Sequence, residues 1–172
     1  MSSQAVLNPQ VAAAPPGNPY TALLEQLLPE RVAPVAAFAE ARMLLQAKTA
    51  ILESGDFISA AEIAQLAGYS TVNPSAQPNR WKRNGAIFAI PHRGSDYFPY
   101  YGLDPDENYR PRKAMGEVLS VFNGVRSGWG LAFWFAGLNS LLDGRRPQDL
   151  LRSHPARVVE AARDEMLGIL HG

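Results

Sequence analysis

The sequence predicts a mainly α-helical protein that carries one small β-hairpin. Apolar residues recur at helical spacing in several segments, and serine, proline and glycine stand where such segments would begin or end. Only the stretch AIFAI…YFPYY, residues 86–101, reads as a pair of short strands. The chain has 172 residues, of which 47% are hydrophobic, so it can form one domain or two small ones.

The N-terminal region begins without periodicity. Residues 1–19 are rich in Ala, Pro, Ser and Asn and are expected to form a flexible arm, and residues 20–28 a short helix. A longer helix is predicted over 34–54, because a proline can occupy its first position and Gly55 can end it. This helix is a candidate for dimerisation, although packing onto its own domain is the alternative. Its apolar face repeats every seven residues, at Phe38, Leu45 and Leu52.

Two short helices joined by a glycine turn are expected next. Ser59 is a good N-cap for the first helix, and Glu62 three residues later completes a capping box. Gly68 makes a sharp turn, and the second helix is expected over 73–84, with prolines restricting its start. This order is typical of a helix-turn-helix.

A hairpin follows the second helix directly. The strand AIFAI, the turn HRGSD and the strand YFPYY form it, and Pro99 predicts that the second strand lies at an edge. A hairpin in this place is a wing. Residues 20–103 are therefore predicted to hold the N-terminal helices and a winged helix-turn-helix module.

The remaining chain is predicted to be helical. Residues 104–111 are polar and read as a linker, and residues 112–172 as a small helical domain. Helices are expected over 112–123 and 131–139, and two more start at Pro147 and Pro155.

The composition argues against several classes of function. The formal net charge is +0 and there is no cysteine, and the three histidines stand apart without metal-ligand spacing. No nucleotide-binding or nucleophile motif occurs, so we expect no enzyme, no metal and no cofactor. The N-terminus lacks a signal peptide, and no apolar run approaches the roughly 20 residues of a membrane span, which favours a cytoplasmic protein.

The second helix and the wing carry a local excess of cations. Arginine and lysine bind phosphates, while arginine and amide side chains read base edges, so DNA contact is one interpretation. A solvated helix face, or a winged module that binds protein, is the other. Trp81 lies about 100° from Arg80 around the helix and is expected to face the core. The candidate DNA-binding residues are Asn73, Gln77, Asn79, Arg80, Lys82, Arg83 and Arg93.

The C-terminal third contains an ordered motif. From Trp134 the chain reads WFAGLNSLLDGRRPQDLLRSHPARVVEAAR. This resembles the toxin-binding domain of Xre/MbcA/ParS-type antitoxins, while the segment 58–100 more loosely resembles winged or excisionase-like helix-turn-helix modules. The hairpin and the long preceding helix depart from the compact Xre-type DNA-binding domain. The matching residues are Trp134, Asn139, Leu142, Gly144, Arg145, Pro147, Asp149, Leu150 and Leu151.

The resemblance implies a function in a toxin–antitoxin system. Proteins of this family bind and block a cognate toxin, often a RES-type enzyme that degrades NAD or transfers ADP-ribose, and commonly bind their own promoter as dimers. A DNA-binding regulator without a toxin and a protein-interaction adaptor that does not bind DNA are the alternatives. The candidate residues of the partner surface are Arg145, Arg146 and Arg152.

Overall fold

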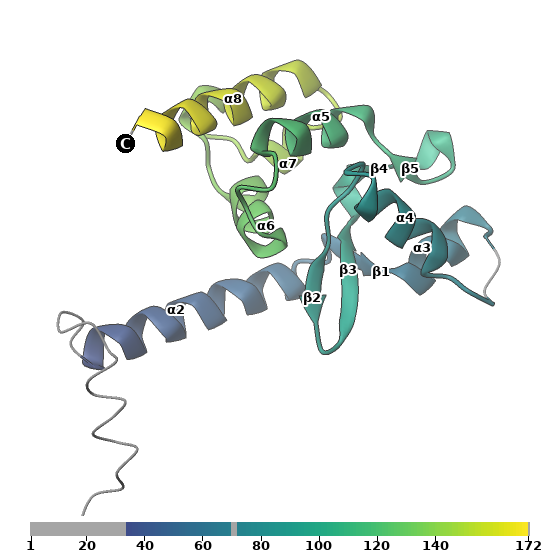
Figure 1. Ribbon diagram of the computed structural model, residues 1–172, viewed down its shortest axis with the longest axis horizontal. Coiled ribbons are helices and arrows are strands. Elements are labelled where there is room, and N and C mark those ends of the chain that lie inside the picture. The colour runs from purple at the N-terminus through teal and green to yellow at the C-terminus, as the bar shows by residue number, and fades with distance from the viewer. Residues whose placement is uncertain (1–33, 70–71, 172) are drawn as a thin grey trace, which may run out of the picture. The chain divides into compact units, whose positions relative to one another are not determined.

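The computed structural model describes residues 34–69 and 72–171 of the chain (Figure 1). It divides into two compact units, residues 1–42 and 43–172, each considered by itself. The predicted arm, 1–19, and the predicted helix, 20–28, lie outside the described residues. The elements in order are α2 (Pro34–Glu53), β1 (Phe57–Ser59), α3 (Ala60–Ala67), α4 (Ala76–Arg83), β2 (Ile90–His92), β3 (Ser95–Pro99), η1 (Tyr100–Gly102), β4 (Leu103–Asp104), η2 (Pro105–Glu107), β5 (Arg110–Pro111), α5 (Lys113–Phe122), α6 (Gly128–Ala136), η3 (Ser140–Leu142), α7 (Pro147–Leu150) and α8 (Pro155–His171).

Helix α2 begins and ends close to the predicted bounds. At its C-terminal end Ile51 is buried and Leu52 packs against the core, whereas Leu45 is 65% exposed. The seven-residue apolar face is therefore buried only at the end that leads into β1.

Helices α3 and α4 form the predicted helix-turn-helix. The capping box is present: the Ser59 hydroxyl accepts from the Glu62 backbone N–H, and the Glu62 carboxylate accepts from the Ser59 backbone N–H at 2.7 Å. Gly68 ends α3 in the left-handed conformation, with φ of 66°. Helix α4 is shorter than the predicted 73–84. Because Pro78 is its third residue, where backbone N–H groups lack helical partners, the ring costs no hydrogen bond.

The sheet has three antiparallel strands rather than two, in the order β1-β3-β2 (Figure 1). Phe57 of β1 pairs with Pro99, so β3 is central and the predicted edge position of this strand is wrong. The proline is tolerated because it is the last residue of β3. The three residues of β1 are too few to show alternation, which explains why the sequence did not reveal the strand.

A single hydrophobic core runs through residues of both predicted modules. The rings of Phe88 and Phe135 stack with centroids 5.8 Å apart and an interplanar angle of 8°. The predicted linker, 104–111, forms β4, η2 and β5, and Arg112 binds the Asp104 carboxylate at 2.9 Å. The boundary drawn at 104–111 therefore does not divide the core.

Helices α5 and α8 pack against each other, and α6 contacts both α7 and β2. Gln148 of α7 is buried and donates to Asp56 Oδ2 at 2.8 Å. This hydrogen bond links the predicted helical domain to the predicted winged module. None of the described helices has both the length and the apolar character that crossing a bilayer requires.

Candidate nucleic-acid interface

One face of α4 is built to be buried and the opposite face is open. Pro78 and Trp81 are buried, and the Trp81 ring lies edge-on to Tyr69 with centroids 6.3 Å apart. At about 100° per residue, this arrangement turns Arg80 and Arg83 outward, with Asn79 beside them. Both arginines are exposed and Asn79 is half-buried.

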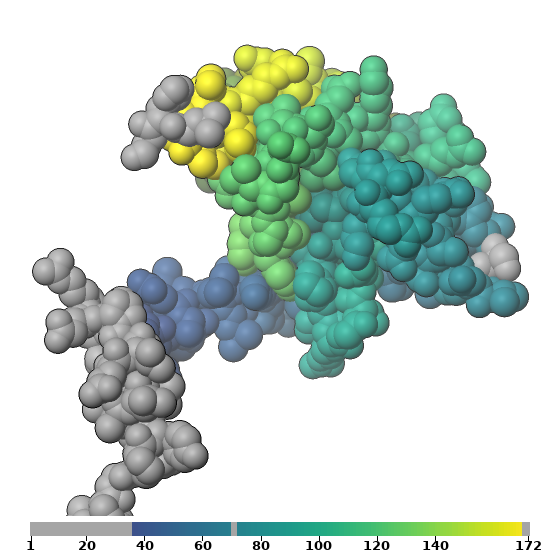
Figure 2. All heavy atoms as spheres, in the orientation of Figure 1, coloured from purple at the N-terminus to yellow at the C-terminus, as the bar shows by residue number. Residues whose placement is uncertain are grey.

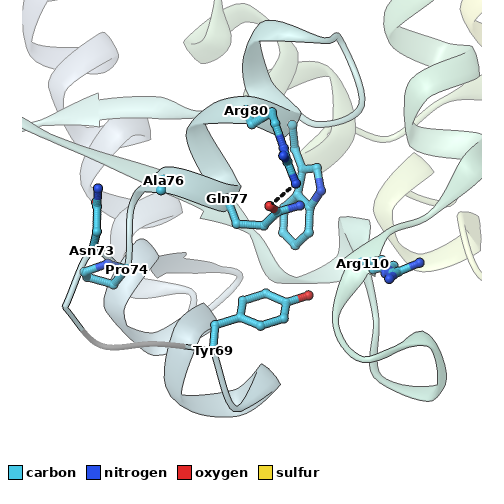
Figure 3. A pocket seen from close by; sticks show the side chains of 8 residues that line it. Tyr69, Asn73, Pro74, Ala76, Gln77, Arg80 and Arg110 are labelled. Atoms are coloured by element: carbon cyan, nitrogen blue, oxygen red, sulfur yellow. Dashed lines mark hydrogen bonds between the residues drawn. The ribbon is translucent and has the colours of Figure 1, made fainter.

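Two of the amide candidates lie at the N-terminal end of α4, where Gln77 is its second residue and Asn73 precedes the helix. Arg80 donates to Gln77 Oε1 (Figure 3). Asn73 Oδ1 accepts from the Ser75 hydroxyl at 3.3 Å. The Gln77 amide thus holds the arginine side chain along the helix, leaving the rest of the guanidinium open.

Lys82 differs from its neighbours. Its ammonium group pairs with the Asp96 carboxylate of β3, which links α4 to the wing. Its charge is therefore partly compensated within the chain.

Arg93 lies in the turn between β2 and β3, at the tip of the wing. The wing projects from the body of the 43–172 unit (Figures 1 and 2). Arg93 and Gly94 both have positive φ, 48° and 79°, as a two-residue hairpin turn requires. The side chain is exposed. Within residues 34–69 and 72–171, neither Arg83 nor Arg93 makes an ion pair or a side-chain hydrogen bond.

Two grooves run along the sides of α4. One, of about 610 Å³, lies between α3, α4 and the wing and is lined by Ser59, Asn79 and Ser95 among others. The other, of about 600 Å³, is lined by residues that include Asn73, Gln77, Arg80 and Arg110. Arg110 was not a candidate from the sequence. It is far from α4 along the chain, and no local pattern relates the two.

The residues of the C-terminal motif support the local fold. The Asn139 side chain accepts from the Leu141 backbone N–H at 2.9 Å, and Gly144 has a φ of 71°. Pro147 opens α7, and Leu150 is buried with Leu142 and Leu151. Each of these residues has an intrachain role that does not need a partner.

The three candidate arginines of the partner surface lie in different environments. Arg146 makes two hydrogen bonds of 2.8 Å to the Asp149 carboxylate. Hydrogen bonding to Asp149 raises the pKa of Arg146 above its ordinary value. Arg152 lies 3.5 Å from Asp106, and both side chains are largely exposed. Arg145 is exposed, and in the described chain its guanidinium has no partner.

The described histidines do not converge. His92 lies against the Tyr97 ring in the wing, whereas His154 Nδ1 contacts the Ser153 hydroxyl at 2.9 Å at the start of α8. Across the described ranges, no three side chains from His, Asp and Glu gather as a metal site.

Comparison with known proteins shows a likeness in fold to a solved structure. No protein-family model matches the chain, and no curated protein matches it either. The NMR structure of Rv2175c is similar with a TM-score of 0.50 and 20% sequence identity. The similarity covers 63% of this chain and 80% of that one, and at this identity it shows the fold alone.

Proposed function

We propose that this protein binds duplex DNA through α4 and the wing, and that it acts by occupying the DNA without making or breaking a covalent bond. Asn79, Arg80 and Arg83 would enter a groove, and Arg93 would contact the backbone beside it. On the antitoxin resemblance, we place this role in the cytoplasm of a bacterial cell.

One observation supports the proposal above the others. Arg80, Arg83 and Arg93 are exposed on one helix and the hairpin next to it, and in the described residues no carboxylate pairs with any of them. By contrast, Lys82 is paired with Asp96, so it is no longer our candidate for a primary phosphate contact. Cations that are already compensated release few counterions on binding, whereas uncompensated cations retain their full attraction to phosphate.

The test is a titration of labelled duplexes, one from upstream of the protein's own reading frame and one of random sequence, over a range of salt concentrations. The double variant R80A/R83A is expected to lose about 10- to 100-fold in affinity, and its salt slope to fall by about two. The matched control R145A/R152A removes as many charges elsewhere. Absence of wild-type binding at low salt, or equal loss in both double variants, would refute the proposal.

A protein partner of the C-terminal region is a second candidate, and one surface feature favours it. Leu138 and Leu141 are 79% and 49% exposed, and backbone bonds between Asn139 and Arg145 bring exposed Arg145 to the same loop. An apolar surface beside a cation suits a protein partner. From the antitoxin resemblance we propose that this partner is a toxin, for example a RES-type enzyme, and that the protein represses the promoter it shares with the toxin.

The experiment for this second candidate is co-expression with the product of the neighbouring reading frame. The product is expected to be toxic alone and to co-purify with this protein, and L138E/L141E is expected to release it while DNA binding persists. A harmless neighbour that elutes separately removes the toxin role. DNA binding without such a neighbour leaves a regulator, and partner binding without DNA leaves an adaptor.

A further inference from the structure

The groove beside α4 that Arg110 lines contains an arrangement that the wing and helix do not explain. Asn73 and Pro74 stand at one side of it and Arg110 at the other, with Gln77, Arg80 and the Tyr69 ring between them (Figure 3). In the described chain its lining holds two guanidinium groups and no carboxylate. A hollow of about 600 Å³ with this lining suits an anionic, hydrogen-bonding group.

Arg110 is held in place by its backbone, while its side chain is free. Its strand β5 pairs with β4, where Arg110 is opposite Asp104, and the Tyr109 backbone N–H donates to Asp104 O at 2.7 Å. The Tyr69 hydroxyl donates to Asn108 O at 3.3 Å, which fastens this hairpin to the end of α3. The exposed Arg110 guanidinium makes no ion pair or hydrogen bond with the described residues, so no contact must break when it turns to a ligand.

The neighbouring Arg112 is not free in this way. Arg112, two residues later, has a side chain only 13% exposed and binds both the Asp104 carboxylate and Tyr101 O. Asp104 is thereby engaged with Arg112 rather than with Arg110. The hairpin thus uses one arginine for its own structure and presents the other beside α4.

We propose that this groove binds a backbone phosphate of the DNA and that Arg110 is its principal ligand, on the side of α4 away from the wing. The proposal rests on the proposed DNA binding. Arg93 would hold the backbone on one flank of the inserted helix and Arg110 on the other, which fixes the angle of insertion without reading any base. Tyr69 acts as a positioning residue, because its hydroxyl fastens the hairpin that carries Arg110.

The experiment measures affinity for the upstream duplex and for random duplex with R110A, R110K and the control R163A, which removes an exposed arginine of α8. R110A is expected to weaken both duplexes equally, by about three- to tenfold, and to lower the salt slope by about one. R110K should retain most of the affinity, and R163A should match the wild type. Y69F is expected to weaken binding less than R110A does, and to have no further effect when added to R110A.

The possible failures are distinguishable. If the wild type does not bind DNA, the proposed function fails, and this inference with it. If the wild type binds and R110A binds equally well, the inference alone is overturned. A further arm titrates AMP and inorganic pyrophosphate in place of DNA: loss of their binding in R110A with unchanged DNA affinity would show a site for a free anion and would overturn the assignment to a DNA phosphate.

Discussion

The arginines of α4 and the wing differ in their pairing from Arg146, the arginine that directly precedes α7. Arg83 and Arg93 are exposed and, in the described chain, unpaired, whereas Arg146 forms a bidentate pair with Asp149 three residues later. Both regions read as basic in the sequence. The comparison shows that the number of cations in a segment says little about binding until the nearby carboxylates have been located.

The largest effect is expected from breaking the core that the predicted winged module shares with the predicted C-terminal helical domain. Phe135 is fully buried and stacks on Phe88, so Phe135→Ala should lower the free energy of unfolding by about 3–5 kcal/mol. Urea denaturation followed by far-UV circular dichroism should show one cooperative transition. Two transitions, only one of them shifted, would mean that the regions fold independently.

The hydrogen bond from Gln148 to Asp56, which links the same two predicted modules, should contribute less to stability. Gln148→Ala leaves the Asp56 carboxylate without its 2.8 Å donor, and a loss of about 1–3 kcal/mol is expected in the same denaturation assay. The control is Gln65→Ala on the exposed side of α3, which should change stability little. Equal stability of the two variants would contradict a tether at Gln148.

Arg146→Ala tests the paired arginine of the comparison directly. Because both members of this pair are partly exposed, the expected loss of stability is about 0.5–1 kcal/mol, with unchanged DNA affinity. Arg83→Ala should show the converse, with normal stability and weaker DNA binding in a fluorescence anisotropy titration. If Arg146→Ala weakened DNA binding as much as Arg83→Ala does, the distinction between the two regions would be lost.

Asp96→Asn should convert a paired cation into a free one. It removes the carboxylate that Lys82 binds, so DNA affinity should rise by about two- to fivefold and the salt slope should steepen. Thermal unfolding should change little, since such a surface pair contributes about 1 kcal/mol at most. Weaker DNA binding would instead indicate that the wing must be fastened to α4 for the complex to form.

The smallest effect concerns the cap of α3. Backbone and side-chain hydrogen bonds from Ser59 lower the pKa of Glu62, so the carboxylate stabilises the fold when ionised. Glu62→Ala should cost up to about 1 kcal/mol at neutral pH. That difference is present above the ordinary glutamate pKa and is lost as pH falls through the lower pKa of the folded state. Urea denaturation at several pH values measures it, and a pH-independent difference would exclude the charge as its source.

Local signals of the sequence were sufficient for most helices. The Ser59–Glu62 capping box, the left-handed Gly68, and the prolines that open α7 and α8 act within one helical turn, so neighbouring residues determine them. The predicted edge position of β3 was wrong because its partner β1 is only three residues long and distant along the chain. The bounds of α4 shifted because the residues before it form a turn instead of a first helical turn.

By itself, therefore, the sequence determined which segments form the longer helices, where those opened by a cap or a proline begin, and that cations concentrate on α4 and the hairpin. Only the tertiary structure decided which of those cations are free. Lys82 is paired by a carboxylate fourteen residues away, and Arg110 reaches the groove of α4 from a strand that follows the wing. Electrostatic compensation depends on distance in space, and folding alone sets that distance.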